Sequence, residues 1–324
     1  MRETIKIAAA LAITGLALAA NAQGDAAFPT RPITIVVPYP AGGTSDAQVR
    51  MFQDALGKAL GQPVIVDNKP GASGAIAAQA VIRSKPDGHT LLYPNNGVVI
   101  APLLNKTAGY DALKDFKPVT QVTAVPMVLV TSKKVPAANL TDFLKYVRSE
   151  PQGIMYASAG TASYGHLASA RFASMAGLKV EHVPYKGEAA TTMAASTGEV
   201  QMLMTTPSSS MLGQVQQGNL TMLGVATAAP SPVVPGVPTI ASVVPGFVSE
   251  VWFGLLAPAA TPDSVVQKIN AAMVKVMSDE SFKTRLLPTG ALPRTSTPAE
   301  LGQIMKNEAA QWREVISKYN IKAD

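Results

Sequence analysis

The chain has 324 residues, of which 47% are hydrophobic and 15% charged, and it contains no cysteine. This composition excludes a disordered chain, and the lack of thiols excludes a disulfide scaffold and a Cys-ligated zinc or iron–sulfur centre. The formal charge of +6 is spread along the sequence, with no basic run longer than Lys133-Lys134. The pattern argues against nucleic acid as a partner and predicts a diffuse field that attracts small anions, or that simply favours solubility.

The N-terminus has the pattern of a secretory signal peptide. Two basic residues precede an apolar stretch from Ile7 to Ala20, which is shorter than the ~20 apolar residues that span a bilayer. Ala20-Asn21-Ala22 supplies small residues around a cleavage site, so we expect residues 1–22 to be removed. The sequence therefore predicts a soluble mature protein located in the bacterial periplasm.

The first part of the mature chain alternates strands with helices. Residues 33–37 are β-branched and apolar on both faces, as in a buried parallel strand, and a glycine loop follows them. Apolar residues three and four positions apart between Val49 and Leu60 then predict a helix. Further strands at 64–66 and 89–93 flank an alanine-rich helix. Strands that alternate with helices predict a parallel α/β sheet.

The same pattern returns in the middle of the chain, and the chain closes with a strand at 251–257 and two helices. The last helix opens with a capping box at Thr297–Glu300. We expect an α/β, periplasmic-binding-protein-like fold of two domains with a ligand cleft between them. Strands are predicted at 127–130, 154–157, 180–183, 200–204 and 220–226. The predicted domains are residues 23–125 plus 250–324 for domain 1 and residues 126–249 for domain 2.

Catalytic and metal chemistry have little support in the sequence. The three histidines, His89, His166 and His182, have no second ligand three or four residues away, so we expect no metal, and no cofactor motif is present. The segment from Tyr156 to Gly160 departs from Gly-x-Ser-x-Gly because the large Tyr156 replaces the small residue that a strained elbow needs. A secreted serine hydrolase that uses Ser158 or Ser163 with His166 remains an alternative, although we predict no catalytic residues.

Two loops of small residues precede helices and suit anion binding. Gly42-Gly43-Thr44 lies in the first lobe and Ser158–Ser163 in the second. A helix N-terminus offers unpaired N–H groups and about half a positive charge, and glycine lets a ligand approach the backbone. Two such ends that face each other would hold an extended dianion. For either loop alone, the alternative is that glycine only makes the turn and that Thr44 or Asp46 only caps the helix.

These residues resemble a known family throughout the mature chain. The matching motifs are Pro40–Asp46 with Arg50, Asn68–Gly74, Pro86-Asp87-Gly88, Tyr156–Gly160 with His166, His182–Gly187 and Trp252–Pro258. The chain resembles the substrate-binding proteins of tripartite tricarboxylate transporters, the Bug family. The resemblance implies a periplasmic receptor, not an enzyme, that closes over a small carboxylate and delivers it to the membrane subunits of such a transporter. A monomer is expected, and an orphan sensor subunit remains an alternative.

The resemblance also implies where the ligand binds. Family loops that match Ala41–Asp46 and Ser158–Ser163 contact carboxylates through backbone amides, hydroxyls and water. The chain departs from the family where Thr205 and Thr206 stand in place of a frequent acidic residue, and loss of that charge would favour a more anionic or differently shaped ligand. The predicted ligand-binding residues are Tyr39, Ala41, Gly42, Gly43, Thr44, Asn95, Asn96, Ser158, Ala159, Gly160, Thr161, Ser163, His166, Tyr185, Thr205 and Thr206.

Overall fold

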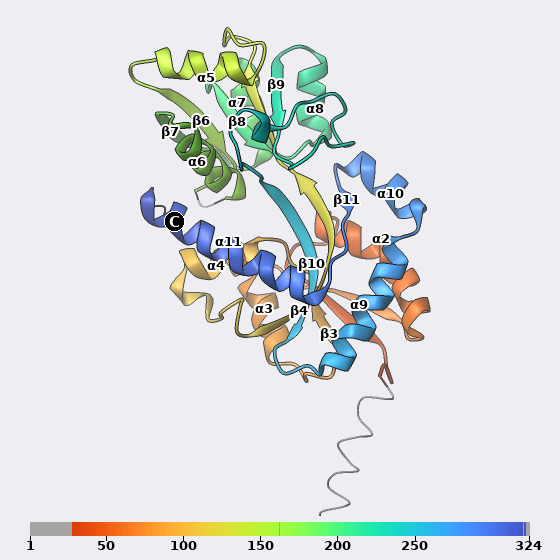
Figure 1. The fold of residues 1–324 in the computed structure, drawn as a ribbon. Coiled ribbons are helices and arrows are strands. Elements are labelled where there is room, and N and C mark those ends of the chain that lie inside the picture. The colour runs from red at the N-terminus through yellow and green to blue at the C-terminus, as the bar shows by residue number, and fades with distance from the viewer. Residues whose placement is uncertain (1–27, 162, 320, 322–324) are drawn as a thin grey trace, which may run out of the picture.

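The structure is a computed structural model that describes residues 28–161, 163–319 and 321. It has two lobes joined by extended strands, and each lobe has its own β-sheet covered by helices (Figure 1). The predicted signal peptide, residues 1–22, lies outside the described residues. Within the described ranges, no helix is both long enough and apolar enough to cross a bilayer.

The first lobe is built on a six-stranded sheet with the order β11-β4-β10-β3-β1-β2. Strands β1, β2 and β3 are parallel, whereas β10 runs antiparallel to β3 and β4 because the chain leaves this lobe along β4 and returns along β10. The parallel sheet predicted for the first strands is therefore only part of a mixed sheet. The strands are β1 Ile33–Val37, β2 Val64–Asn68, β3 Thr90–Leu92, β4 Phe116–Pro126, β10 Glu250–Pro258 and β11 Leu292–Pro293. The helices are α2 Thr44–Leu60, α3 Ala75–Ile82, α4 Gly97–Leu104, α9 Asp263–Met277, α10 Glu280–Leu286 and α11 Pro298–Lys318.

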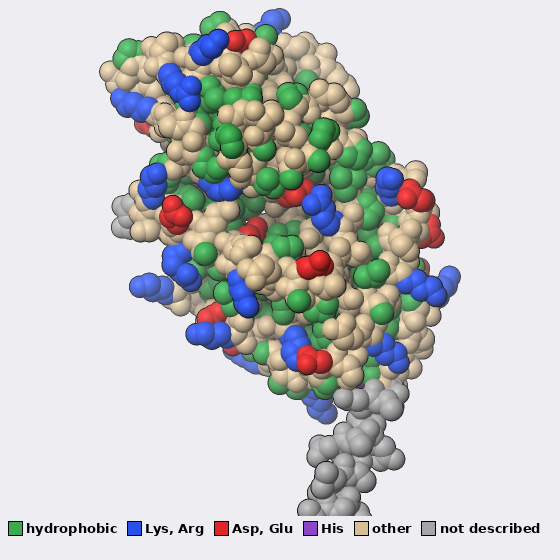
Figure 2. Space-filling view, viewed as in Figure 1, with side chains coloured by type: hydrophobic (Ala, Val, Ile, Leu, Met, Phe, Trp, Pro, Cys, Tyr) green, Lys and Arg blue, Asp and Glu red, His purple; other side chains and the backbone are tan. Residues whose placement is uncertain are grey.

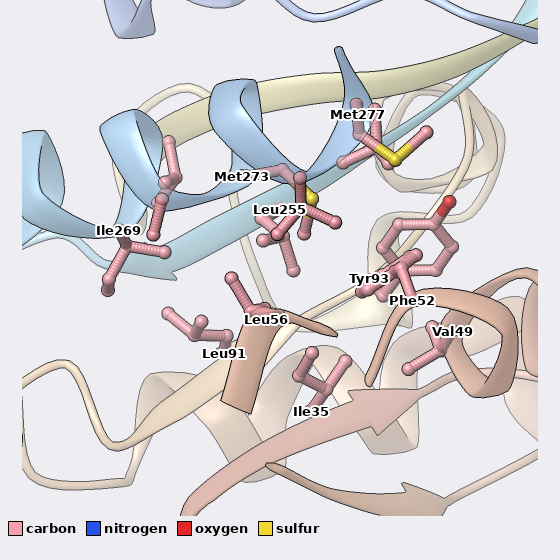
Figure 3. Packing of buried hydrophobic residues seen from close by; sticks show 14 of the residues in the cluster. Ile35, Val49, Phe52, Leu56, Leu91, Tyr93, Leu255, Ile269, Met273 and Met277 are labelled. Carbon is pink, nitrogen blue, oxygen red and sulfur yellow. The ribbon is translucent and has the colours of Figure 1, made fainter. Parts of the chain in front are cut away.

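Helices α2 and α9 cover one face of this sheet. Val49, Phe52 and Leu56 are spaced three and four residues apart, so they share one side of α2 and are fully buried. They pack in one cluster with Ile269 and Met273 of α9 (Figure 3). Helices α3, α4 and α11 cover the opposite face with a second apolar cluster. The sheet is thus held between two helical layers, which fixes the positions of its strand ends.

The second lobe has a five-stranded sheet with the order β7-β6-β8-β5-β9. Helices α5 and α6 contribute buried apolar residues to a cluster on one face, and α7 and α8 contribute to a cluster on the other. Strand β6 is parallel to β7 and β8, and β5 is antiparallel to β8 and β9. The strands are β5 Val128–Ser132, β6 Ile154–Ser158, β7 Val180–Pro184, β8 Met202–Thr205 and β9 Leu220–Val225. The helices are α5 Leu140–Ser149, α6 Tyr164–Ala176, α7 Glu188–Thr197 and α8 Ser209–Gln216.

Two chain segments run between the lobes side by side. The amide of Met127 donates to the carbonyl of Ser249 at 3.0 Å, and the amide of Ser249 donates to the carbonyl of Ala226 at 2.8 Å. Helix α11 also reaches from the first lobe to the second, where Lys318 Nζ donates to Ser174 Oγ at 2.6 Å. The crossings at Met127 and Ser249 lie next to the predicted domain boundaries at 125/126 and 249/250, and these boundaries stay a prediction.

Candidate ligand-binding site

A cavity of about 590 Å³ lies between the two lobes, and we call it the main cavity. The surface in Figure 2 is indented where the lobes meet, and acidic and basic side chains are interspersed over this face of the molecule. Both lobes contribute to the cavity wall, which mixes apolar side chains with hydroxyls and amides. It is lined by Tyr39, Pro40, Gly43, Thr44, Ser45, Asn95, Asn96, Gly97, Ile100, Val125, Tyr164, Glu188, Thr206, Pro207, Ser208, Val251, Phe253 and Thr289.

The N-terminal ends of five helices meet at this cavity. Thr44 of α2, Gly97 of α4, Tyr164 of α6, Glu188 of α7 and Ser208 before α8 all line it. Helices α2 and α7 begin after glycines and have no side-chain cap, so their first-turn N–H groups are left for water or a ligand. Five positive helix ends around one space favour an anion without the help of a basic side chain.

Two smaller cavities continue the main cavity. The small cavity, of about 120 Å³, shares Tyr164, Glu188, Thr206 and Val251 with it. The side cavity, of about 450 Å³, shares Tyr39, Gly97 and Ile100 with it. Shared walls make the three cavities one branched space between the lobes.

The structure brings most of the predicted ligand-binding residues to this space. Those that line the main cavity are Tyr39, Gly43, Thr44, Asn95, Asn96 and Thr206. Ser158, Ala159, Ser163 and Thr205 line the small cavity, and Thr161 and Ser163 line the side cavity. Ala41, Gly42, Gly160, His166 and Tyr185 are not among the lining residues of the three cavities. Lining a cavity does not test ligand contact, so the assignment of these residues stays a prediction.

Gly42 has a local structural role. Its φ of +82° lies in the left-handed region that favours glycine, and its amide donates to Asp46 Oδ2 at 2.9 Å. The same oxygen accepts a hydrogen bond from Arg50 Nε at 2.9 Å. The Arg50 hydrogen bond is the main cause that holds the pKa of Asp46 below its usual value. Gly42 and Asp46 therefore shape the turn that presents Gly43 and Thr44 to the main cavity.

Tyr39 and Asn95 form a polar pair on the first-lobe wall. Tyr39 Oη donates to Asn95 Oδ1 at 2.6 Å, and the same oxygen accepts the amide of Gly97 at 2.9 Å. Burial raises the pKa of Tyr39 to about 12, so the phenol stays protonated and keeps its hydrogen to donate. A Cβ at Gly97 would lie 2.9 Å from Asn95 Oδ1 and 3.4 Å from Tyr39 Oη, which explains glycine at this position.

Asn96 faces away from the pair, into the contact between β10 and α11. Its Nδ2 donates to Glu308 Oε1 at 2.5 Å and to the carbonyl of Glu250 at 3.2 Å, and its Oδ1 accepts the amide of Trp252 at 3.1 Å. Trp252 Nε1 donates to Glu308 Oε2 at 2.8 Å. Burial raises the pKa of Glu308 to about 7, against the lowering effect of its hydrogen bonds from Trp252 and Asn96. The Asn96 side chain is thus committed to positioning the crossing strand.

The histidine predicted to partner Ser158 in a hydrolase is the wrong one. Ser158 Oγ lies 2.7 Å from His182 Nε2. His166 makes an edge-on contact with His182, with ring centroids 3.7 Å apart, and its Nδ1 lies 3.4 Å from Tyr156 Oη. Ser158 Oγ also lies 2.8 Å from the carbonyl of Gly160, and when its single hydrogen is donated there, His182 donates to the serine oxygen. That arrangement gives Ser158 no general base. No cluster with metal-binding geometry occurs within the described ranges.

Glu188 is a cavity residue that the sequence analysis did not identify. It lines both the main and the small cavity, and its Oε1 lies 3.5 Å from Thr206 Oγ1, the residue that replaces a frequent acidic side chain. The carboxylate of Glu188 places a negative charge beside Thr206 from α7, and the effect of the two threonines on ligand choice stays a prediction. The one sequence signal for Glu188 as a cavity residue is its position directly after Gly187, at the end of the segment that follows the predicted strand at 180–183.

Comparisons with known proteins agree with this architecture. Residues 48–321 match the family model described as "Tripartite tricarboxylate transporter family receptor". A UPF0065 protein from the tcbD–tcbE intergenic region of Pseudomonas sp. strain P51 is 33% identical over 321 residues, which cover 98% of this chain and 95% of that protein.

Two solved structures are similar over nearly the whole fold. The R. palustris protein Rpa4515 with adipate is 32% identical with a TM-score of 0.73, and the match covers 91% of this chain and 99% of that one. MatC from Rhodopseudomonas palustris with bound malate is 32% identical with a TM-score of 0.69, and the match covers 89% and 100%. The chain belongs to the tripartite tricarboxylate transporter receptor family, also known as the Bug family.

Proposed function

We propose that this receptor captures a small organic carboxylate between its lobes in the periplasm and delivers it to the membrane subunits of a tripartite tricarboxylate transporter. Membership of the family makes the chain a solute-binding protein and not a serine hydrolase. We further propose that it acts as a monomer, with domain 1 formed by residues 23–125 and 250–324 and domain 2 by residues 126–249.

The observation that carries the proposal is the convergence of five helix N-termini on one cavity without a basic side chain. Backbone N–H groups and hydroxyls bind carboxylates by hydrogen bonds and dipoles, and water can bridge groups that do not fit directly. The similar structures that hold adipate and malate support a carboxylate as the ligand class. Because residues of both lobes line the cavity, a ligand that contacts both would favour the closed arrangement.

A thermal-shift screen of mono-, di- and tricarboxylates, acidic amino acids and aromatic acids tests the proposal first, since a ligand of the folded state raises the Tm. The variant Thr44→Asp then tests the α2 end. Thr44 is exposed at the first position of the helix, where aspartate is compatible with the helix dipole but repels a ligand carboxylate. We expect affinity for the best carboxylate to fall on the order of tenfold or more.

The matched control is Thr44→Asn, which has nearly the same shape as the aspartate variant but no charge. Its affinity should stay within a few-fold of wild type, as measured by isothermal titration calorimetry. Equal affinities of the two variants would show that the carboxylate does not bind near α2. A wild-type protein that binds no carboxylate in the screen would refute the proposed function itself.

A further inference from the structure

The branched space between the lobes contains a single charged side chain. Glu188 is the only carboxylate among the lining residues of the three cavities, and lysine, arginine and histidine are absent from them. Within the described residues, none of the ion pairs includes Glu188. Its side-chain hydrogen bond with Thr206, at 3.5 Å, is at the limit of what a hydrogen bond allows. A carboxylate therefore faces the ligand space with its capacity to accept hydrogen bonds largely unused.

A second carboxylate is a poor partner for this group. The helix ends around the main cavity attract a ligand carboxylate, but a further negative charge beside Glu188 would also meet a like charge, and no basic side chain lines the cavity to compensate it. Partial burial of its carboxylate raises the pKa of Glu188, the hydrogen bond from Thr206 opposes that shift, and the residue as a whole is exposed. A cation that arrives with the ligand would stabilise the charged carboxylate further.

The placement of Glu188 also gives the site a direction. Thr44 and Ser45 of α2 belong to the first lobe, whereas Glu188 belongs to the second, and all three line the main cavity. A ligand that spans the cavity can present an anionic end to α2 and a different end to Glu188. An acidic residue in the first turn of α7 also favours the helix dipole, but that effect alone does not require its side chain to line a ligand cavity.

We propose that the ligand is zwitterionic: its carboxylate binds at the N-terminus of α2, and its protonated amino group binds the carboxylate of Glu188. This inference rests on the proposed function and narrows its ligand class from carboxylates in general to aminocarboxylates. The charge-assisted hydrogen bond between an ammonium group and a carboxylate is shorter and stronger than a neutral one, and it discriminates against a second anionic end.

Pairs of linear ligands with the same number of chain carbons test the inference. They are succinate and 4-aminobutyrate, glutarate and 5-aminopentanoate, and adipate and 6-aminohexanoate, each titrated by calorimetry at pH 7.5. In at least one pair, wild type should bind the amino ligand at least tenfold more tightly than the dicarboxylate. Glu188→Gln should remove at least tenfold of that preference, because glutamine keeps the shape and one acceptor but loses the charge.

The matched control is Glu181→Gln, which removes an exposed carboxylate from β7 of the same lobe, outside the three cavities. It should leave the preference unchanged. The inference fails if wild type prefers the dicarboxylate in every pair, if no amino ligand binds, or if Glu188→Gln leaves the preference intact. In each of these cases, carboxylate binding that depends on Thr44→Asp would keep the proposed function standing, so the two failures are distinguishable.

Discussion

Substitution of Asn96 tests which residues of the first lobe stabilise the fold and which bind the ligand. Its side chain is 1% exposed and connects Glu308 of α11 to the Trp252 amide of β10. Asn96→Ala removes a hydrogen bond to an acidic group, worth roughly 1.5–3 kcal/mol, and leaves the buried amide without that acceptor, which costs about 1–3 kcal/mol. We expect the free energy of unfolding to fall by about 3–5 kcal/mol, with less than full additivity because the hydrogen bonds to Glu308, Glu250 and Trp252 all involve one side chain.

Urea denaturation followed by tryptophan fluorescence measures this change, since Trp252 lies at the perturbed contact. The matched control is Asn95→Ala, which removes a half-buried acceptor of Tyr39 and should cost only about 1 kcal/mol while it weakens ligand affinity. Asn96→Ala should therefore act mainly on stability and Asn95→Ala mainly on binding. A loss of less than 1 kcal/mol for Asn96→Ala would refute the reasoning.

Two further predictions concern pH and the mouth of the cavity. Burial, assisted by His182, lowers the pKa of His166 from 6.5 to about 4, so the unfolded state binds a proton at a pH where the folded state does not. Between pH 7.5 and 5, wild type should therefore lose about 2 kcal/mol of stability that His166→Gln does not lose. An equal loss of stability in the two proteins, measured by urea denaturation, would contradict this. Gly290→Ala should weaken ligand binding several-fold, because its Cβ would lie 3.3 Å from the carbonyl of Pro207 in the other lobe. The control Gly246→Ala has a similar positive φ, but its Cβ would lie in open space. Equal calorimetric affinities of the two variants would exclude a contact between the lobes at Gly290.

The sequence predicted the regular elements wherever the pattern of burial is simple. The strand at 33–37 and the helix with Val49, Phe52 and Leu56 were both recoverable, because each has an unbroken apolar face. Prolines bound the strand, and glycines bound the helix. The capping box of Thr297 and Glu300 was predicted correctly as well, since it depends on two side chains three residues apart. These features depend on residues close together in the chain, so they can be predicted from a single sequence.

Features that depend on tertiary contacts were missed. Strand β4 contains the buried polar residues Thr120 and Thr123, which interrupt its apolar pattern; their hydroxyls find partners in the carbonyl of Ser296 and in Gln48, far away along the chain. The mixed sheet follows from the two opposed chain crossings, which no local pattern records. The structural role of Asn96 could not be predicted from its neighbours in the sequence, because Glu308, which accepts a hydrogen bond from its side-chain amide, lies on the last helix.

The site as a whole explains how one receptor fold can serve different carboxylates. Donors from the main chain at helix ends are present whatever the side chains are, so they provide attraction to an anion but little choice among anions. Choice must then come from the few side chains that penalise the wrong ligand. In this chain the carboxylate of Glu188 is the side chain that can impose such a penalty, because it is the single charge on the walls of the ligand space. Specificity that depends on one charged group should change with one substitution, and for that reason Glu188→Gln is expected to admit carboxylates with a second anionic end while it weakens the binding of aminocarboxylates.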